Sequence, residues 1–352
     1  VTAAEAKSQP LNGMPLHAQQ FSGNPNGTTA EQKEFDVSRR NFMALVFCLM
    51  AGTAALPHIL MRYYTTPSVR EARTSVAWSL LFIFALYVTA PALAVLVKYE
   101  VFHVLVGTPF DQLPAWMVAW SKVDPALLSV ADVNHDNILQ LNELSMGGDI
   151  IVLATPEIGG LPYVVSGLVA AGGLAAALST ADGLLLAIAS SLSHDLYYKM
   201  IDPSASTARR VTISKMLLLI VALSAAYLAA QKPADILFLV SAAFSFAAAA
   251  FFPALTLGIF WKRATGVAAS IGMVAGLGVT SYYMVTTQPW LRELFGITSP
   301  VHLWWDILPI SAGIFGVATG FVTIVVVSLL TRQPSREVLA LVDDIRYPRS
   351  DA

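Results

Sequence analysis

Seven stretches of this 352-residue chain are each long and apolar enough to cross a lipid bilayer. A crossing helix needs about 20 mostly apolar residues, because the hydrocarbon core of a bilayer is roughly 30 Å thick. The stretches cover approximately residues 41–60, 74–97, 162–190, 211–230, 235–260, 266–287 and 303–330. Hydrocarbon offers no water to backbone N–H and C=O groups, so each stretch is predicted to be a helix. The predicted fold class is an all-α, polytopic membrane protein with about seven transmembrane helices.

The composition supports a chain that lives in a membrane. Charged residues make up 12% of the sequence and hydrophobic residues 56%, with a mean hydropathy of +0.63. Too few charges are present to cover so much apolar surface in water. The lipid bilayer is therefore an expected partner. The net charge of −2 gives no reason to expect nucleic acid, and the single cysteine, Cys48, excludes an internal disulfide framework.

Basic residues in the short connections predict the orientation of the chain. Alternate connections and the C-terminal end carry most of them: Arg62, Arg70, Arg73, Lys199, Arg209, Arg210, Lys262, Arg263, Arg332, Arg336, Arg346 and Arg349. Cytoplasmic loops are rich in Lys and Arg, so this side and the C-terminus are predicted to be cytoplasmic, in the plasma (inner) membrane. The other connections carry fewer basic residues: Lys98, Lys122, Lys232 and Arg292. Arg39 and Arg40, just before the first stretch, favour the opposite orientation.

This orientation divides the chain into five parts. They are an extracytoplasmic polar loop (1–40), two spans (41–97), a second extracytoplasmic loop (98–161), five spans (162–330) and a cytoplasmic tail (331–352). Residues 1–40 lack the apolar core of a signal peptide. We therefore expect them to be a loop that follows another segment, and the chain to be a fragment.

The first span contains two residues that disturb a helix, Gly52 and Pro57. Pro57 cannot donate a hydrogen bond to the carbonyl of Thr53 and crowds that turn, and Gly52 lets the backbone open. A broken helix is therefore expected near 52–57. The break is either a packing kink or the discontinuous helix that secondary transporters place at a substrate site, and the two interpretations have equal weight here.

The third span carries polar side chains in its middle: Ser179, Thr180 and Asp182. Each hydroxyl can donate to the carbonyl four residues earlier, which satisfies it within its own helix. The carbonyl of Ala176 and the two hydroxyls then lie together, and three neutral oxygens suit a hard cation such as Na⁺. Asp182 follows one turn later. It either sits in a hydrated vestibule or acts in a gate or as a second layer around the cation.

The loop 98–161 contains "DVNHDNILQLNE" (132–143), which has the spacing of an EF-hand calcium loop. Its expected ligands are Asp132, Asn134, Asp136, the carbonyl of Ile138, Gln140 and Glu143. Asn137 stands where such loops place a glycine in a left-handed conformation, and Asn is the best substitute. The expected role is a structural Ca²⁺ clip in the outer loop. A solvated loop that only has this spacing is the alternative.

Several long segments resemble the sodium/solute symporter family, in its acetate-permease-like, monocarboxylate branch. They are "FCLMAGTAALPHILMRYYTTPSVREARTS" (47–75), "LPYVVSGLVAAGGLAAALSTADGLLLAIASSLSHDLYYK" (161–199), "FFPALTLGIFWKR" (251–263) and "PISAGIFGVATGF" (309–321). The resemblance covers about residues 41–347. The sequence departs from the family after "WKRAT", where "GVAASIG" follows without the usual longer link.

The resemblance implies a fold and a set of sites. The family has a leucine-transporter-type core of two inverted five-helix repeats, so spans one to five would be the second repeat and spans six and seven extra helices. The first repeat would lie in a missing N-terminal half. By resemblance, the sodium ligands are the Ala176 carbonyl, Ser179 and Thr180. Substrate contacts are expected around Gly52, Thr53 and Ala54, next to Pro57.

The expected function is therefore Na⁺-coupled symport of a small monocarboxylate such as acetate. A transporter-like sensor module and a passive channel are the alternatives. An enzyme is not expected, because no His/Asp/Ser constellation and no set of ligands for a catalytic metal is present in the sequence.

Overall fold

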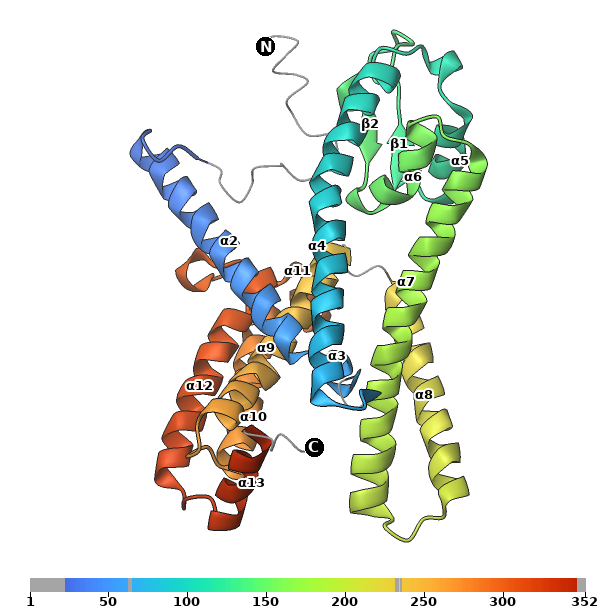
Figure 1. The fold of residues 1–352 in the computed structure, drawn as a ribbon. Helices are drawn as coiled ribbons and strands as arrows, with labels where there is room; N and C mark the ends of the chain where they lie inside the picture. Colours follow the sequence, from blue (N-terminus) through green and yellow to red (C-terminus); the bar gives the residue numbers. More distant parts are fainter. Residues whose placement is uncertain (1–22, 63–64, 232–233, 235, 347–352) are drawn as a thin grey trace. The chain divides into compact units, whose positions relative to one another are not determined.

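The computed structural model describes residues 23–62, 65–231, 234 and 236–346. Helices dominate this part of the chain, and seven of them are long and apolar enough to cross a membrane (Figure 1). The all-α polytopic fold class is thereby confirmed. The long helices are α2 (Thr29–Ala55) with its continuation α3 (Pro57–Arg62), α4 (Val69–Glu100), α7 (Tyr163–Ser190), α8 (Thr207–Ala230), α9 (Ile236–Phe260), α10 (Gly266–Thr287) and α12 (Gly313–Leu330).

The chain divides into two compact units. One contains α4, the segment that follows it, and α7 as far as Leu185. The other contains α2, α3 and the chain from Leu186 onward. In the second unit, α7 continues into a π-helical segment (Ser191–Ile201), and α11 (Pro289–Leu294) follows α10. Arg292 on α11 is buried and donates to the carbonyls of Thr286 and Ser299.

Small residues let three helices of the second unit approach closely. α10 packs on α9 and α12, and the three lie side by side in Figure 1. A Cβ added at Gly276 would lie 2.4 Å from the carbonyl oxygen of Ala249 on α9 and 2.8 Å from that of Gly316 on α12. Glycine at such a crossing allows backbone-to-backbone contact, which drives association of membrane helices.

The helix α2 begins at Thr29, twelve residues before the predicted span. The expectation of a polar loop over 1–40 is therefore wrong for residues 29–40, while 1–22 lie outside the described residues. Thr28 and Glu31 form a capping box, in which Thr28 N–H donates to Glu31 Oε2 (2.7 Å) and Glu31 N–H to Thr28 Oγ1 (3.4 Å). Glu, Gln and Lys are also strong helix formers, so the helix extends through polar sequence.

Hydrogen bonds tie α2 to the loop before α12. Asn41 Nδ2 donates to the carbonyl of Asp306 (2.8 Å), and Asn41 Oδ1 accepts from Leu308 N–H (2.7 Å). The two arginines that contradict the charge rule both face aspartates here. Arg39 lies 2.9 Å from Asp36 and Arg40 lies 3.6 Å from Asp306.

The seventh span is shorter than predicted. The prediction placed its start at residue 303, whereas a 3₁₀ turn (Pro309–Ser311) leads into α12 at Gly313. Trp305 (φ 51°) and Asp306 (φ 59°) adopt the left-handed conformation, and a right-handed helix cannot include them. The 3₁₀ turn Trp304–Asp306 therefore lies outside the span.

The segment between α4 and α7, predicted as an extracytoplasmic loop with an EF-hand-like segment (98–161), folds into a small domain of helical turns and two strands. We call residues 101–158 the interhelical domain. Its elements are a π-helical turn (Val101–Leu105), 3₁₀ turns at Phe110–Gln112, Leu141–Glu143 and Gly148–Ile150, helices α5 (Ala115–Val123) and α6 (Ile151–Ile158), and strands β1 (Leu128–Val130) and β2 (Leu144–Met146). The strands pair antiparallel, with Leu128 opposite Met146.

This domain has its own hydrophobic core. The fully buried side chains include Leu105, Met117, Leu128, Leu139, Leu144 and Met146. The apolar runs between 101 and 158 are too short to cross a membrane, so the sequence did not predict a span there. The two strands bring these runs together, and their side chains then form a hydrophobic core.

The C-terminal tail contains one more helix, α13 (Arg336–Arg346). Asp343 Oδ1 lies 2.6 Å from Lys262 Nζ, which follows α9. The tail is therefore helical over these residues and carries an ion pair to the connection between α9 and α10.

Candidate cation and substrate sites

The predicted cation ligands lie on one side of α7. Thr180 Oγ1 donates to the carbonyl oxygen of Ala176 (3.1 Å), as predicted. Ser179 makes no corresponding bond to Ala175 in the described structure, so its hydroxyl is free to turn. Residues three and four apart on a helix are neighbours, so Ala176, Ser179 and Thr180 present their oxygens on adjoining positions.

The surface around these oxygens is uncovered. Every residue from 171 to 182 is exposed. A Cβ at Gly172 would meet no atom within 4 Å, and one at Gly173 would touch only the Leu153 side chain, at 3.4 Å. Small residues on a membrane helix permit close approach of another helix.

Asp182 lies on the same exposed stretch, one turn after Ser179. It has neither a hydrogen-bond nor an ion-pair partner among the described residues. A carboxylate in hydrocarbon costs about 2.5–3.5 kcal/mol on insertion scales. Asp182 therefore needs water or a polar partner beside it.

The broken helix has its interruption at a single residue. α2 ends at Ala55, Leu56 is extended (φ −66°, ψ 119°), and α3 begins at Pro57. Proline is favoured at the first position of a helix, because its missing N–H would be unbonded there in any case. Thr53 and Ala54 are exposed just before the break, and Thr53 Oγ1 donates to the carbonyl of Leu49 (2.7 Å).

Gly52 has a different environment from its neighbours. It is buried against α9, where a Cβ would lie 2.5 Å from the carbonyl oxygen of Phe244. The glycine thus permits close contact between α2 and α9. Residues 52–57 and residues 176–182 belong to different compact units, and each is described within its own unit.

The interhelical domain brings three carboxylates of the predicted calcium loop together. One carboxylate oxygen from each of Asp132, Asp136 and Glu143 lies within 4.8 Å of the others. Hydrogen bonds, first of all from Ile138 N–H, hold the pKa of Asp136 below its ordinary value, so this group is ionised at neutral pH. Asn137 has φ 58°, the left-handed conformation predicted for it, and His135 shares it (φ 59°).

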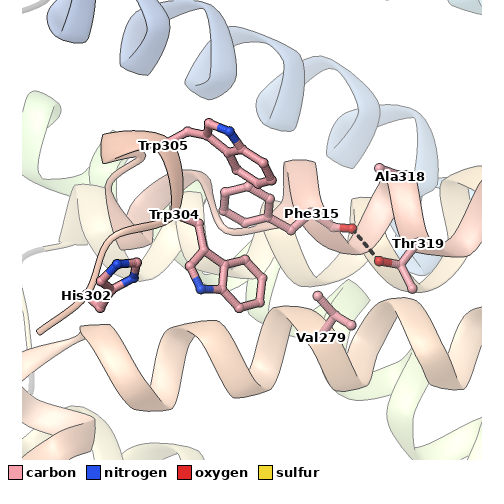
Figure 2. Close-up of a pocket in the computed structure, with 7 residues that line it drawn as sticks. All are labelled: Val279, His302, Trp304, Trp305, Phe315, Ala318 and Thr319. Atoms are coloured by element: carbon pink, nitrogen blue, oxygen red, sulfur yellow. Dashed lines mark hydrogen bonds between the residues drawn. The ribbon is translucent and has the colours of Figure 1, made fainter. Parts of the chain in front are cut away.

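Sequence reasoning missed an aromatic pocket of about 680 Å³ beside the start of α12 (Figure 2). Its walls are Val279, His302, Trp304, Trp305, Phe315, Ala318 and Thr319. Ring centroids of Trp304 and Trp305 lie 5.1 and 5.8 Å from that of Phe315. The adjacent tryptophans in "VHLWWD" (301–306) were the available signal, since Trp gathers at membrane–water interfaces.

Comparison with known proteins places these features in a family context. Residues 152–276 match the model of the sodium:solute symporter family. The chain is 55% identical over 317 residues to an uncharacterized symporter of Cupriavidus necator, an alignment that covers 90% of this chain and 46% of the relative. It is 30% identical over 243 residues to a monocarboxylic acid transporter of Corynebacterium glutamicum, covering 67% of this chain and 38% of that protein.

The chain thus spans less than half the length of these two curated relatives. Both printed names describe transport proteins, and the matched family segment includes the whole of α7. The comparisons therefore confirm the resemblance predicted from the sequence, which is to the sodium:solute symporter family.

Proposed function

We propose that this chain forms part of a secondary active transporter that couples inward movement of Na⁺ to uptake of a small monocarboxylate such as acetate. The family match and the two relatives support transport in general. The name of the Corynebacterium glutamicum relative, a monocarboxylic acid transporter, favours a monocarboxylate as the solute.

The observation that carries the proposal is the exposed polar stretch of α7. Asp182 would cost about 2.5–3.5 kcal/mol in contact with lipid, and it shares an exposed stretch with Ala176, Ser179 and Thr180. A covering helix would give Asp182 a polar partner, and the small residues before it allow such a helix to come close. The Ala176 carbonyl and the two hydroxyls then supply part of a Na⁺ site, and the covering helix supplies the remaining ligands.

The break at Leu56 is the proposed substrate region. Secondary transporters bind substrates where a membrane helix is interrupted, because the unwound backbone can be satisfied by ligand and water. Thr53 and Ala54 are exposed beside this break and are the candidate contacts, with Pro57 fixing where the second half begins. Gly52 supports the site indirectly, by keeping α2 against α9.

Coupling follows from the membrane potential and the concentration gradient. One Na⁺ moving inward releases about 2.3 kcal/mol per 100 mV from the potential, and a monocarboxylate anion moving with it costs the same amount. Symport of one Na⁺ with one anion is therefore driven by the Na⁺ concentration gradient, and the potential contributes only when a further Na⁺ moves with them. Asp182, one turn from the oxygens, adds a negative charge near the cation and is proposed as a gate or second-layer residue.

The test is counterflow of labelled acetate in proteoliposomes that contain the full-length protein. We expect exchange of acetate in the presence of Na⁺, and accumulation against a gradient when Na⁺ is imposed from outside. Choline replaces Na⁺ in the control. Uptake that ignores the Na⁺ gradient would indicate a channel, and acetate binding without flux would indicate a sensor. Either result contradicts symport.

The proposed orientation, in the plasma (inner) membrane with a cytoplasmic C-terminus, can be tested by labelling. Cys48, the single cysteine of this sequence, is buried, so cysteines introduced here can be labelled once any cysteines elsewhere in the full-length protein have been replaced by serine. Gln112→Cys lies in the interhelical domain and Ser335→Cys precedes α13, and both positions are exposed. A membrane-impermeant maleimide should label only position 112 in intact cells. Labelling of position 335 alone would show that the chain has the opposite orientation.

A further inference from the structure

We propose that residues 132–143 of the interhelical domain bind one Ca²⁺ ion and that this ion stabilises the domain. The proposal is independent of the transport mechanism. It rests on the sequence pattern together with four features of the domain: the convergence of three carboxylates, an unsatisfied buried oxygen, a free backbone carbonyl and the anchoring of the loop in a hydrophobic core.

The three carboxylates converge from distant points of the loop. Asp132 and Asp136 come from its first half and Glu143 from its last position, and one oxygen of each lies within 4.8 Å of the others. Glu143 is only 7% exposed. Its Oε1 accepts from Val133 N–H (2.9 Å) and its Oε2 from Gln140 N–H (2.9 Å), which fixes it across both ends of the loop.

Asp132 supplies the observation that points to a ligand. Its Oδ2 accepts from Asn137 N–H (3.1 Å), but its Oδ1 is buried without any hydrogen-bond partner. A buried carboxylate oxygen without a donor is expensive, because it has lost its water and gained nothing in exchange. A cation among the three carboxylates would satisfy it.

The backbone also leaves one oxygen free at the expected place. Ile138 faces Pro109 in an isolated antiparallel bridge. The two hydrogen bonds of this bridge come from its neighbours: Phe110 N–H donates to Asn137 (3.0 Å) and Leu139 N–H to Thr108 (2.9 Å). Neither bond uses the Ile138 carbonyl, which stands at the position where an EF-hand loop supplies its backbone ligand.

The remaining two ligands are side-chain amides. Asn134 Nδ2 and Gln140 Nε2 both donate to Asp136 Oδ2, at 2.9 and 2.7 Å. Rotating either amide by half a turn would present its oxygen in place of its nitrogen. All six ligand atoms are then oxygens, and this set suits Ca²⁺ better than Mg²⁺, which demands near-ideal octahedral geometry and usually keeps several waters.

The loop is joined to the core of the domain, so the ion would act on the whole of it. Leu139 is fully buried among Leu105, Leu128 and Leu144. Gly107 N–H donates to the Leu139 carbonyl (2.8 Å), which ties the loop to the segment after α4. The three carboxylates repel one another when their oxygens lie within 4.8 Å, and a Ca²⁺ ion between them would attract all three.

The experiment uses the full-length protein in detergent, with CaCl₂, MgCl₂ or a chelator added. Equilibrium binding of ⁴⁵Ca²⁺ measures affinity. Trypsin cleavage after Lys122 measures the order of the domain, because Lys122 at the end of α5 is exposed and is the only Lys or Arg between residues 99 and 161. We expect one ion with a dissociation constant of about 10⁻⁴–10⁻³ M and slower cleavage with Ca²⁺ than with Mg²⁺.

Two isosteric variants and one control distinguish the site from general charge effects. Asp136→Asn and Asp132→Asn each remove one carboxylate and should weaken Ca²⁺ binding at least about tenfold. Asp111→Asn removes an exposed carboxylate of the same domain outside the loop and should bind as the wild type does. Absence of Ca²⁺ binding by the wild type at millimolar concentrations, equal effects of Mg²⁺, or unchanged affinity in both loop variants would each overturn the proposal.

Discussion

The crossing of α9, α10 and α12 offers a stability test whose magnitude can be worked from the structure. Gly276→Ala would place its Cβ 2.4 Å from the Ala249 carbonyl oxygen and 2.8 Å from that of Gly316. Ordinary contact begins about 1 Å further out, and both obstacles are backbone atoms that no rotamer change can move. Overpacking of this kind costs about 1–3 kcal/mol, and the gain in helix propensity offsets about 1 kcal/mol. Because two helices must move, we expect a net loss of about 2 kcal/mol.

Gly278→Ala is the matched control on the same helix. Its Cβ would meet no atom within 4 Å, so only the propensity gain of up to about 1 kcal/mol remains. Thermal unfolding of the purified protein, followed by tryptophan fluorescence, compares the two. The Tm of Gly276→Ala should fall by about 2–3 °C, while that of Gly278→Ala stays level or rises. Equal Tm values for the two variants would refute the close crossing.

Three further predictions concern other parts of the chain. Asn41→Ala removes both hydrogen bonds between α2 and the loop before α12 and should cost about 1–2 kcal/mol, seen as a lower Tm than that of Lys33→Ala on the same helix. Leu139→Ala should cost the interhelical domain about 2–5 kcal/mol and speed trypsin cleavage after Lys122, and unchanged cleavage would contradict its core role. Ala54→Leu should raise the KM for acetate at unchanged Na⁺ activation, and an unaltered KM would remove this residue from the substrate region.

The sequence predicted the spans well because membrane burial leaves a strong and local signal. Apolar runs of about 20 residues need no knowledge of tertiary contacts. The break beside Pro57 was predictable for the same reason, since the lost hydrogen bond of proline is a local property. The structure has this interruption at Leu56.

What the sequence did not predict depends on contacts between distant residues. The interhelical domain forms because Leu128 and Met146 meet across two strands. The short apolar runs in this part of the sequence do not predict which residues pair. The start of α12 was misplaced because Trp305 and Asp306 are left-handed, and the Asp306 carbonyl accepts a hydrogen bond from Asn41, which lies far away in the sequence. The role of Gly52 in packing against Phe244 likewise requires α9 to be in place.

The central claim is that the oxygens of Ala176, Ser179 and Thr180 on α7 take part in a Na⁺ site. Its most direct test is equilibrium binding of ²²Na⁺ to the full-length protein and to Ser179→Ala and Thr180→Ala. Ser224→Ala is the control, because Ser224 is an exposed hydroxyl on α8 that donates to a carbonyl four residues earlier, as Thr180 does. We predict at least about tenfold weaker Na⁺ binding in both α7 variants, since each of them loses one oxygen ligand. The Na⁺ affinity of the control should equal that of the wild type. Unchanged Na⁺ affinity in both α7 variants would contradict the account.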